Sequence, residues 1–322
     1  MCSLLAGLAS ASRNSGDLAG AKEAAEEALA LRRRLLVQET SSIQTHLDIA
    51  CALEQLAAIS QDLGEAQNAA TAREEALELA RRLSNSHPQS QACTRQLAIA
   101  LGAWADVLDR QERNDEAQAC LEESLDAYSS LTDVEGSEVE LDLRLGLTKL
   151  AVHCMAQNDL ARARELLENA LMISRQLCNL DPDNFDAQFA VAVDVGFLAD
   201  VSVREGNTVA AAGYSAESLD ARDALVRRAP NDVHVQNLLW SAMWSHATWF
   251  PSGRVQWADV AAALERLHRR DQLGLSDLVY LEEARELAKG APASMSLHDA
   301  WLGPLGPPPR LPIGTDETRL KG

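Results

Sequence analysis

Aromatic side chains are scarce in this sequence of 322 residues: Phe, Trp and Tyr make up 4% of it, although hydrophobic residues make up 47%. The apolar volume is therefore mostly Ala and Leu. Both residues favour helices, whereas strands are enriched in aromatic and β-branched residues. The shortage of aromatic residues thus favours closely packed helices over sheets.

Long apolar runs are also missing. No stretch approaches the roughly 20 apolar residues that a membrane-spanning helix needs. The apolar start, residues 1–11, lacks the basic segment of a secretory signal. The six cysteines include no C-x-x-C pair, which favours small buried thiols over a metal site or a disulfide framework. We therefore expect a protein of the reducing cytoplasm.

Basic residues are outnumbered. There are 29 Lys and Arg against 48 Asp and Glu, so the net charge is −19. A strongly negative chain repels nucleic acid phosphates and anionic membranes. This balance argues against nucleic acid and membrane partners, and it permits a basic protein partner.

Signatures of catalysis are absent from the sequence. It contains no GxxxxGK[ST], HExxH or GxSxG motif, and its seven histidines lack the spacing of metal ligands. The acidic segment Asp181–Asn184 lacks the later Gly and Glu of an EF-hand, and a helix stop followed by an N-cap explains it. Pairs such as Glu26–Glu27 and Glu74–Glu75 recur with the repeat, which indicates a solvated helix face rather than acid–base chemistry. We expect no enzyme, no metal and no cofactor.

The sequence does contain a frame that repeats about every 48 residues. We call its five turn positions the frame origins; they are Gly16, Gly64, Glu112, Asn158 and Gly206. Alanine stands seven places before each origin, at Ala9, Ala57, Ala105, Ala151 and Ala199. Alanine stands again five places after it, at Ala21, Ala69, Ala117, Ala163 and Ala211. A fixed period of this size predicts a stacked repeat protein.

Each unit is predicted to be a pair of helices joined by a tight turn at the frame origin. Apolar residues at i, i+4, i+7 and i+8 mark the first helix, as at Ile49, Leu53, Leu56 and Ala57. N-cap residues stand 22 places before an origin at Ser42, Ser90 and Asn184, and Asp232 stands 22 places before Arg254, which ends the turn of the degenerate sixth unit. In the fourth unit a capping box is expected at Ser137 and Glu140.

Glycine at the origins allows a positive φ at little cost, and Asn is the next best residue. Because Glu112 breaks this rule, we expect a looser third turn.

The predicted fold is all-α: a right-handed solenoid of stacked antiparallel helix pairs over residues 1–290. Its units are about 1–40, 41–88, 89–135, 136–182, 183–230 and a degenerate sixth at 231–272, followed by a capping helix at 276–289. Atypical ends are expected where an array covers its last apolar face. Prolines and glycines interrupt residues 291–322, for which we expect a disordered tail.

The frame resembles the tetratricopeptide repeat. When each origin is numbered fifteen, small residues fall at positions eight, twenty and twenty-seven, as Ala9, Ala21 and Ala28 do in the first unit. Ser124 and Ser218 replace the last alanine in the third and fifth units. The units exceed the family's 34 residues, which is similar to the long-unit variety found in large bacterial signalling proteins. The place of the family's proline, position thirty-two, is occupied by Arg33, Arg81, Ser129, Arg175 and Asp223.

The resemblance implies that the first helices line a concave side, where the family binds extended peptides. At the positions that face this groove we expect partner contacts from Glu54, Asp106, Asp109, Arg110, Asp200 and Arg204. Acidic spots there could hold Arg or Lys of a partner, and an ordinary solvated wall is the alternative.

Three tryptophans, Trp240, Trp244 and Trp249, gather in the sixth unit. They are expected either to fill the end of the array or to form a contact surface, and Trp244 is the candidate contact residue. An exposed patch here would suggest docking of another domain or a second copy, so self-association stays open.

The sequence as a whole predicts a scaffold or adaptor that binds a peptide or protein partner on the concave surface. The alternative is the sensor or regulatory C-terminal portion of a larger bacterial signalling enzyme, with an ATPase-like or protease-like effector upstream. The first helix, which begins about seven residues short of its siblings, favours this alternative.

Overall fold

The computed structural model describes residues 2–38, 42–131, 137–270, 272–273 and 277–290. These residues form thirteen α-helices and contain no strand, so the predicted all-α class is confirmed. The helices are α1 (Cys2–Ser15), α2 (Leu18–Gln38), α3 (Ile43–Asp62), α4 (Ala66–Ser86), α5 (Gln91–Arg110), α6 (Asn114–Ser129), α7 (Ser137–Ala156), α8 (Leu160–Leu180), α9 (Phe185–Arg204), α10 (Thr208–Arg228), α11 (Val233–Trp249), α12 (Trp257–Arg269) and α13 (Leu278–Ala288). The tail expected over 291–322 lies outside the described residues.

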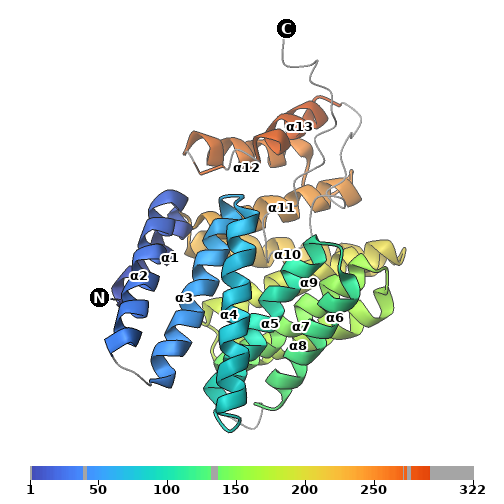
Figure 1. The fold of residues 1–322 in the computed structure, drawn as a ribbon. Helices are drawn as coiled ribbons and strands as arrows, with labels where there is room; N and C mark the ends of the chain where they lie inside the picture. Colours follow the sequence, from blue (N-terminus) through green and yellow to red (C-terminus); the bar gives the residue numbers. More distant parts are fainter. Residues whose placement is uncertain (1, 39–41, 132–136, 271, 274–276, 291–322) are drawn as a thin grey trace.

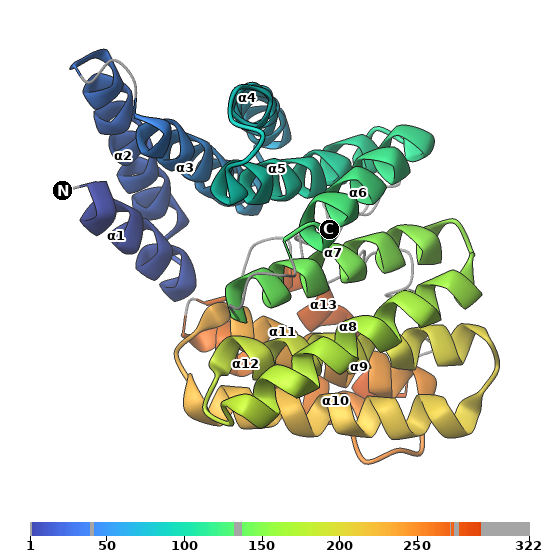
Figure 2. The same cartoon turned by 90° about the horizontal axis from the view of Figure 1, so that it is seen from below.

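Consecutive helices pair and the pairs stack into a curved array (Figure 1). The odd-numbered helices α3, α5, α7 and α9 also contact one another in succession. The array therefore curves toward these first helices, which form its concave wall. The curvature is strong enough to bring α1 against α11, and a Cβ at Gly16 would lie 3.7 Å from Val233 Cγ2 (Figure 2).

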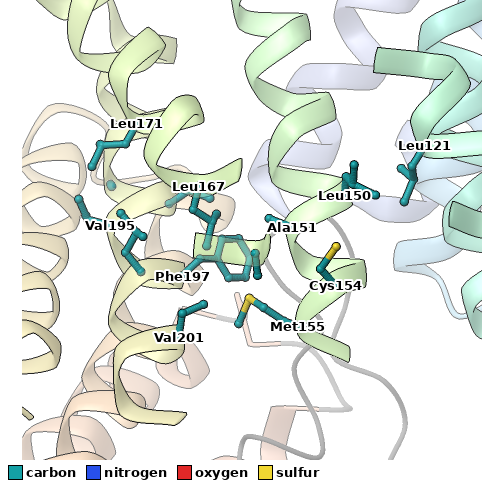
Figure 3. Packing of buried hydrophobic residues seen from close by; sticks show 14 of the residues in the cluster. Leu121, Leu150, Ala151, Cys154, Met155, Leu167, Leu171, Val195, Phe197 and Val201 are labelled. Carbon is teal, nitrogen blue, oxygen red and sulfur yellow. The ribbon is translucent and has the colours of Figure 1, made fainter. Parts of the chain in front are cut away.

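Alanine in the frame marks the places where helices cross. All ten alanines seven places before and five places after an origin are buried, with exposed fractions of 0–3%. Their small side chains let two helix axes approach closely, and leucines fill the space beside them. Figure 3 shows this packing around Ala151, which lies among Leu150, Cys154, Leu167 and Phe197.

The predicted N-caps are confirmed where their side chains are described. Ser42, Ser90 and Asn184 each accept a hydrogen bond from the backbone N–H three residues on, and Asp232 accepts from both His234 and Val235. Each cap satisfies a backbone donor that the first turn leaves unpaired. The side chain of Ser137, expected to cap α7, lies outside the described residues.

The third turn is not looser than the others, so that expectation was wrong. Glu112 adopts a φ of 60°, beside 61° at Asn158 and 74° at Gly206. The Arg113 N–H donates to Leu108 O at 3.0 Å, as the Glu65 N–H donates to Ser60 O at 2.8 Å in the second unit. The packing of α5 on α6 imposes the left-handed turn even where the residue disfavours it.

Glu112→Gly should therefore raise the free energy of unfolding by about 0.5–1 kcal/mol, because glycine removes the Cβ strain of the left-handed conformation. Thermal and denaturant unfolding would measure this gain. Gln111→Gly is the matched control: its φ of −90° needs no glycine, so that change should destabilise. A Glu112→Gly protein no more stable than the parent would refute strain at this turn.

Ion pairs repeat along the second helices. Arg33, Arg81 and Arg175, which stand in place of the family's proline, reach Glu75, Glu123 and Glu217 of the following unit at 2.5, 3.8 and 2.6 Å. The recurring glutamates are thus not only a solvated face, because Glu75 and Glu123 each bridge two units. These pairs are exposed, so each contributes at most about 1 kcal/mol, and they help to set the register between units.

A buried polar cluster joins the fourth and fifth units. The Asp194 carboxylate on α9 has no exposed surface, and it accepts bonds from Arg144 and Thr148 on α7 and from Ser174 on α8. Arg144 also donates to Ala190 O at 3.3 Å. Every oxygen of the buried charge therefore has a donor, as a buried ion pair requires.

The end of the array is a separate apolar cluster built around tryptophan. The Trp244 ring contacts Trp257 and Tyr280 edge-on, with ring centres 5.0 and 5.3 Å apart. Tyr280 and Leu281 of α13 are buried against this cluster. The last helix thus covers apolar surface of α11 and α12.

Candidate partner-binding surface

Polar contacts between successive first helices run along the concave wall. They join residues about one unit apart: Gln55 Nε2 to Ala6 O at 2.9 Å, Cys51 Sγ to Gln96 Oε1 at 3.2 Å, and Lys149 Nζ to Gly102 O at 2.9 Å. Arg204 Nη1 donates to Met155 O at 3.0 Å in the same way. The wall is therefore a polar surface whose groups bind one another across units.

Three of the acidic residues predicted to contact a partner already have basic partners within the chain. Asp106 accepts from Lys149 Nζ at 2.7 Å, and Asp109 lies 2.8 Å from His153 Nδ1. Asp200 accepts from Arg204 Nε at 3.1 Å, which pairs two of the predicted residues with each other. A basic group of a partner would have to displace these contacts, so the acidic spots are weaker sites for cations than the sequence suggests.

The centre of the wall holds a group that we call the concave cluster: Glu54 on α3, Arg73 on α4, Asp106 and Arg110 on α5, and Lys149 on α7. Arg73 Nη2 lies 3.9 Å from Asp106 Oδ2, and the side chain of Arg73 is only 7% exposed. Its Nε has no hydrogen-bond partner among the described residues, and neither has the buried Oε1 of Glu54. The cluster thus combines fixed charge with unmet hydrogen-bonding capacity.

The pKa values of Glu54 and Arg110 are shifted from their ordinary range. Burial raises the pKa of Glu54 to about 8; the charges of Arg73 and Lys149 oppose the shift and that of Asp106 adds to it. Partial desolvation by its neighbours lowers the pKa of Arg110 although the residue is exposed; the positive charge of Arg73 lowers it further and the negative charge of Asp106 opposes the shift. Glu54 is therefore mostly protonated at neutral pH.

The raised pKa makes Glu54 a pH-dependent cost to stability. Between pH 4.5 and about 8 the unfolded chain ionises this carboxyl group and the folded chain does not, so stability falls as pH rises through that window. Glu54→Gln should remove this slope and raise the free energy of unfolding at pH 7 by roughly 1–3 kcal/mol. Urea unfolding at several pH values would measure it, with the exposed Glu27→Gln as control. An unchanged pH slope in Glu54→Gln would show that the carboxyl group is ionised in the folded protein.

Trp244 does not belong to a contact surface. Its side chain is fully buried, so it offers nothing for a partner to touch, and the core-filling alternative describes it.

The remaining predicted residues all lie on first helices, but the structure divides them. Glu54, Asp106 and Arg110 belong to the concave cluster, Asp109 follows one turn along α5, and Asp200 and Arg204 form a separate pair on α9.

Sequence reasoning missed Arg73 and Lys149. Arg73 lies on a second helix, whereas the family's partner-binding positions lie on first helices. The repeat frame nevertheless indicates that Arg73 is unusual. Nine places after an origin the other units have Ala25, Leu121, Leu167 and Ser215, all of them buried. An arginine at a place that is otherwise small or apolar identifies a buried charge.

Other kinds of site have less support. Across the described ranges, no three His, Cys, Asp or Glu side chains are grouped so that they could hold a metal ion. Every helix in these ranges is too short or too polar to span a bilayer.

Comparisons with known proteins agree with this architecture. A family model described as tetratricopeptide repeat matches residues 2–40. No curated protein matches the sequence. Among solved structures, the apo form of RapI is 12% identical to this chain, with a TM-score of 0.55; the alignment covers 89% of this chain and 95% of RapI. BtubC (BKLC) from P. vanneervenii is 17% identical, with a TM-score of 0.50; the alignment covers 85% of this chain and 93% of BtubC.

A further similar structure is a Rap protein complexed with Competence and Sporulation Factor, at 12% identity and a TM-score of 0.52. The alignment covers 88% of this chain and 74% of the Rap protein. Identities this low show a shared fold and nothing more. The family model matches the first unit, and the same frame and the same turn recur in the units that follow. The first unit matches the tetratricopeptide repeat and the whole array shares the helical fold of these structures, which agrees with the resemblance found in the sequence.

Proposed function

We propose that this protein is a cytoplasmic, non-enzymatic scaffold that binds an extended segment of a partner protein along its concave wall. The fold supports the general role, because stacked repeats create long concave binding surfaces. A Rap protein of similar fold is complexed with Competence and Sporulation Factor, which supports a protein or peptide partner for this fold.

One observation supports the position of the site. Of the ten buried polar atoms that lack hydrogen-bond partners among the described residues, half lie in the second to fourth units: Glu54 Oε1, Gln61 Oε1, Arg73 Nε, Gln96 Nε2 and His153 Nε2. Leaving such an atom unpaired costs about 1–3 kcal/mol, so native structures contain few of them. Because these atoms are buried, a peptide can pair with them only if the side chains that cover them move on binding.

Selection from a displayed library of random peptides tests this proposal. We expect selected peptides to bind one per chain and to slow amide hydrogen exchange in α3, α5 and α7. Arg110→Glu on the concave wall should weaken binding at least tenfold. Arg227→Glu, an equal charge change at an exposed site on α10, should leave it unchanged. Protection confined to the second helices, or equal loss in both variants, would contradict a concave site.

A further inference from the structure

We propose that an exposed group of arginines on the outer side of α12 docks an acidic helix of a partner protein. The group consists of Arg266, Arg269 and Arg270 on α12 with Arg285 on α13, and we call it the arginine surface. Figure 1 shows α12 and α13 beyond α11 at one end of the array. The arginine surface is therefore a second docking surface, separate from the concave cluster, and it does not depend on the proposed function.

The arginine surface is open to solvent. All four of its side chains are exposed, and that of Arg269 is 73% exposed. The opposite side of α12 packs in the tryptophan-rich cluster, where Val260 and Leu264 are fully buried. This packing fixes the direction in which α12 presents its arginines. A partner can thus reach them without moving any side chain that covers them.

The positive charge of this surface is largely uncompensated. Among the described residues, Glu265 alone pairs with it, accepting from Arg269 Nη2 at 3.2 Å and from Arg285 Nε at 3.0 Å. Arg266 and Arg270 form no ion pair with any residue that the structure describes. This local excess of positive charge stands in a chain whose net charge is −19. It indicates attraction for an acidic group.

The dipole of α12 does not account for the arginines by itself. A helix dipole places about half a negative charge at the C-terminal end, which favours basic residues there. Half a charge balances less than one of the three arginines that α12 contributes. On the α13 side, Glu282 and Glu286 lie close to Arg285 in sequence, so the excess positive charge belongs to α12.

The rest of the array indicates what such arginines bind. Arg33, Arg81 and Arg175 on second helices each reach a glutamate of the next second helix, at 2.5, 3.8 and 2.6 Å. The second helix of the sixth unit is α12, and the described residues contain no later one. The helix that follows, α13, turns Arg285 rather than a glutamate toward this side. An added acidic helix would supply the pairing that joins the other units.

Spacing and charge define the partner further. Arg266 and Arg270 lie one helical turn apart, about 6 Å along the axis, so carboxylates three or four residues apart on a helix match them. Arginine binds carboxylates through paired, charge-assisted hydrogen bonds. Nucleic acids and anionic membranes present extended negative charge, which the rest of this acidic chain repels. A short acidic protein segment fits best.

Peptide selection with a counter-selection step tests this inference. A displayed library of random peptides is bound to the parent protein, and peptides that also bind the double variant Arg266→Glu with Arg270→Glu are removed. We expect the remaining peptides to carry acidic residues three or four apart and to slow amide hydrogen exchange in α12 and α13. Their affinity should fall roughly tenfold or more in the double variant, and several-fold between about 50 and 300 mM salt. Lysine in place of the peptide's acidic residues should restore binding to the double variant.

Two controls make the result specific. Arg34→Glu with Arg227→Glu is an equal charge change at exposed arginines of α2 and α10, and it should leave binding unchanged. Arg110→Glu on the concave wall should also leave it unchanged, so this test is independent of the concave site. Thermal unfolding of each variant should match the parent, because all the altered side chains are exposed.

Three outcomes would overturn the inference. It fails if counter-selection leaves no peptide, or leaves neutral or basic ones. It fails as well if duplex DNA or phosphatidylserine vesicles bind through Arg266 and Arg270 and no acidic peptide does. If the parent protein dimerises on gel filtration and the double variant does not, the occupant is a second copy rather than a separate partner.

Discussion

Asp194→Ala should lower the free energy of unfolding of the middle units by about 3–5 kcal/mol, since it leaves the buried Arg144 guanidinium without its counter-charge. Thr148 and Ser174 would lose their acceptor in the same step. Circular dichroism during urea unfolding should show the midpoint shift. The loss should be among the largest for any single change, because α7, α8 and α9 all contribute to this cluster.

The matched control is Asp223→Ala. Asp223 forms an exposed pair with Arg227 within one helix, so its removal should change stability by no more than about 0.5 kcal/mol. A double variant, Arg144→Met with Asp194→Leu, should recover much of the loss, since apolar side chains of similar volume can replace a buried ion pair. If Asp194→Ala were as mild as Asp223→Ala, the cluster would not be buried in solution.

Trp244→Ala should cost about 3–5 kcal/mol at the C-terminal end of the array, because it opens a cavity between α11, α12 and α13. Repeat units contact only their neighbours, so this loss should be local. The same region also contains Trp240, Trp249 and Trp257, whereas Trp104 lies far from it along the chain. Tryptophan fluorescence therefore mainly measures the unfolding of the C-terminal end of the array. We expect the fluorescence transition to move to lower urea than the transition measured by circular dichroism.

Trp249→Ala is the control for this experiment. Its side chain is half-buried at the end of α11, so the loss should be clearly smaller. Coincident transitions by both probes in Trp244→Ala would show that the whole array unfolds as one unit. An unchanged fluorescence midpoint would mean that Trp244 is not packed as the structure has it.

The contact between α1 and α11 affects how a partner could reach the concave wall. If a partner binds along the first helices as proposed, the contact between the first and sixth units limits how a segment can enter the array. A segment could be threaded along it, or the two ends could separate on binding. Hydrogen exchange at α1 and α11 during the peptide experiments distinguishes these routes, since separation would speed exchange at both helices.

The sequence by itself determined the features that repeat. The all-α class, the helix pairs, the alanine crossings and the N-caps follow from local periodicity and local hydrogen bonds, which recur with each unit. Ala151 is buried for the same reason as Ala57 and Ala105, and one frame predicts all three.

Only the tertiary structure decided the features that depend on which residues meet across units. Glu112 takes a positive φ because its flanking helices require it, and Trp244 is buried because α13 folds back over it. Asp106, Asp109 and Asp200 looked available in the sequence, but Lys149, His153 and Arg204 pair with them. These partners are set by the curvature and spacing of the array, which a one-dimensional frame does not contain. The packing of α4 on α3 and α5 places the charge of Arg73 near Glu54 and Arg110, so the charge of the concave cluster depends on packing rather than on any motif.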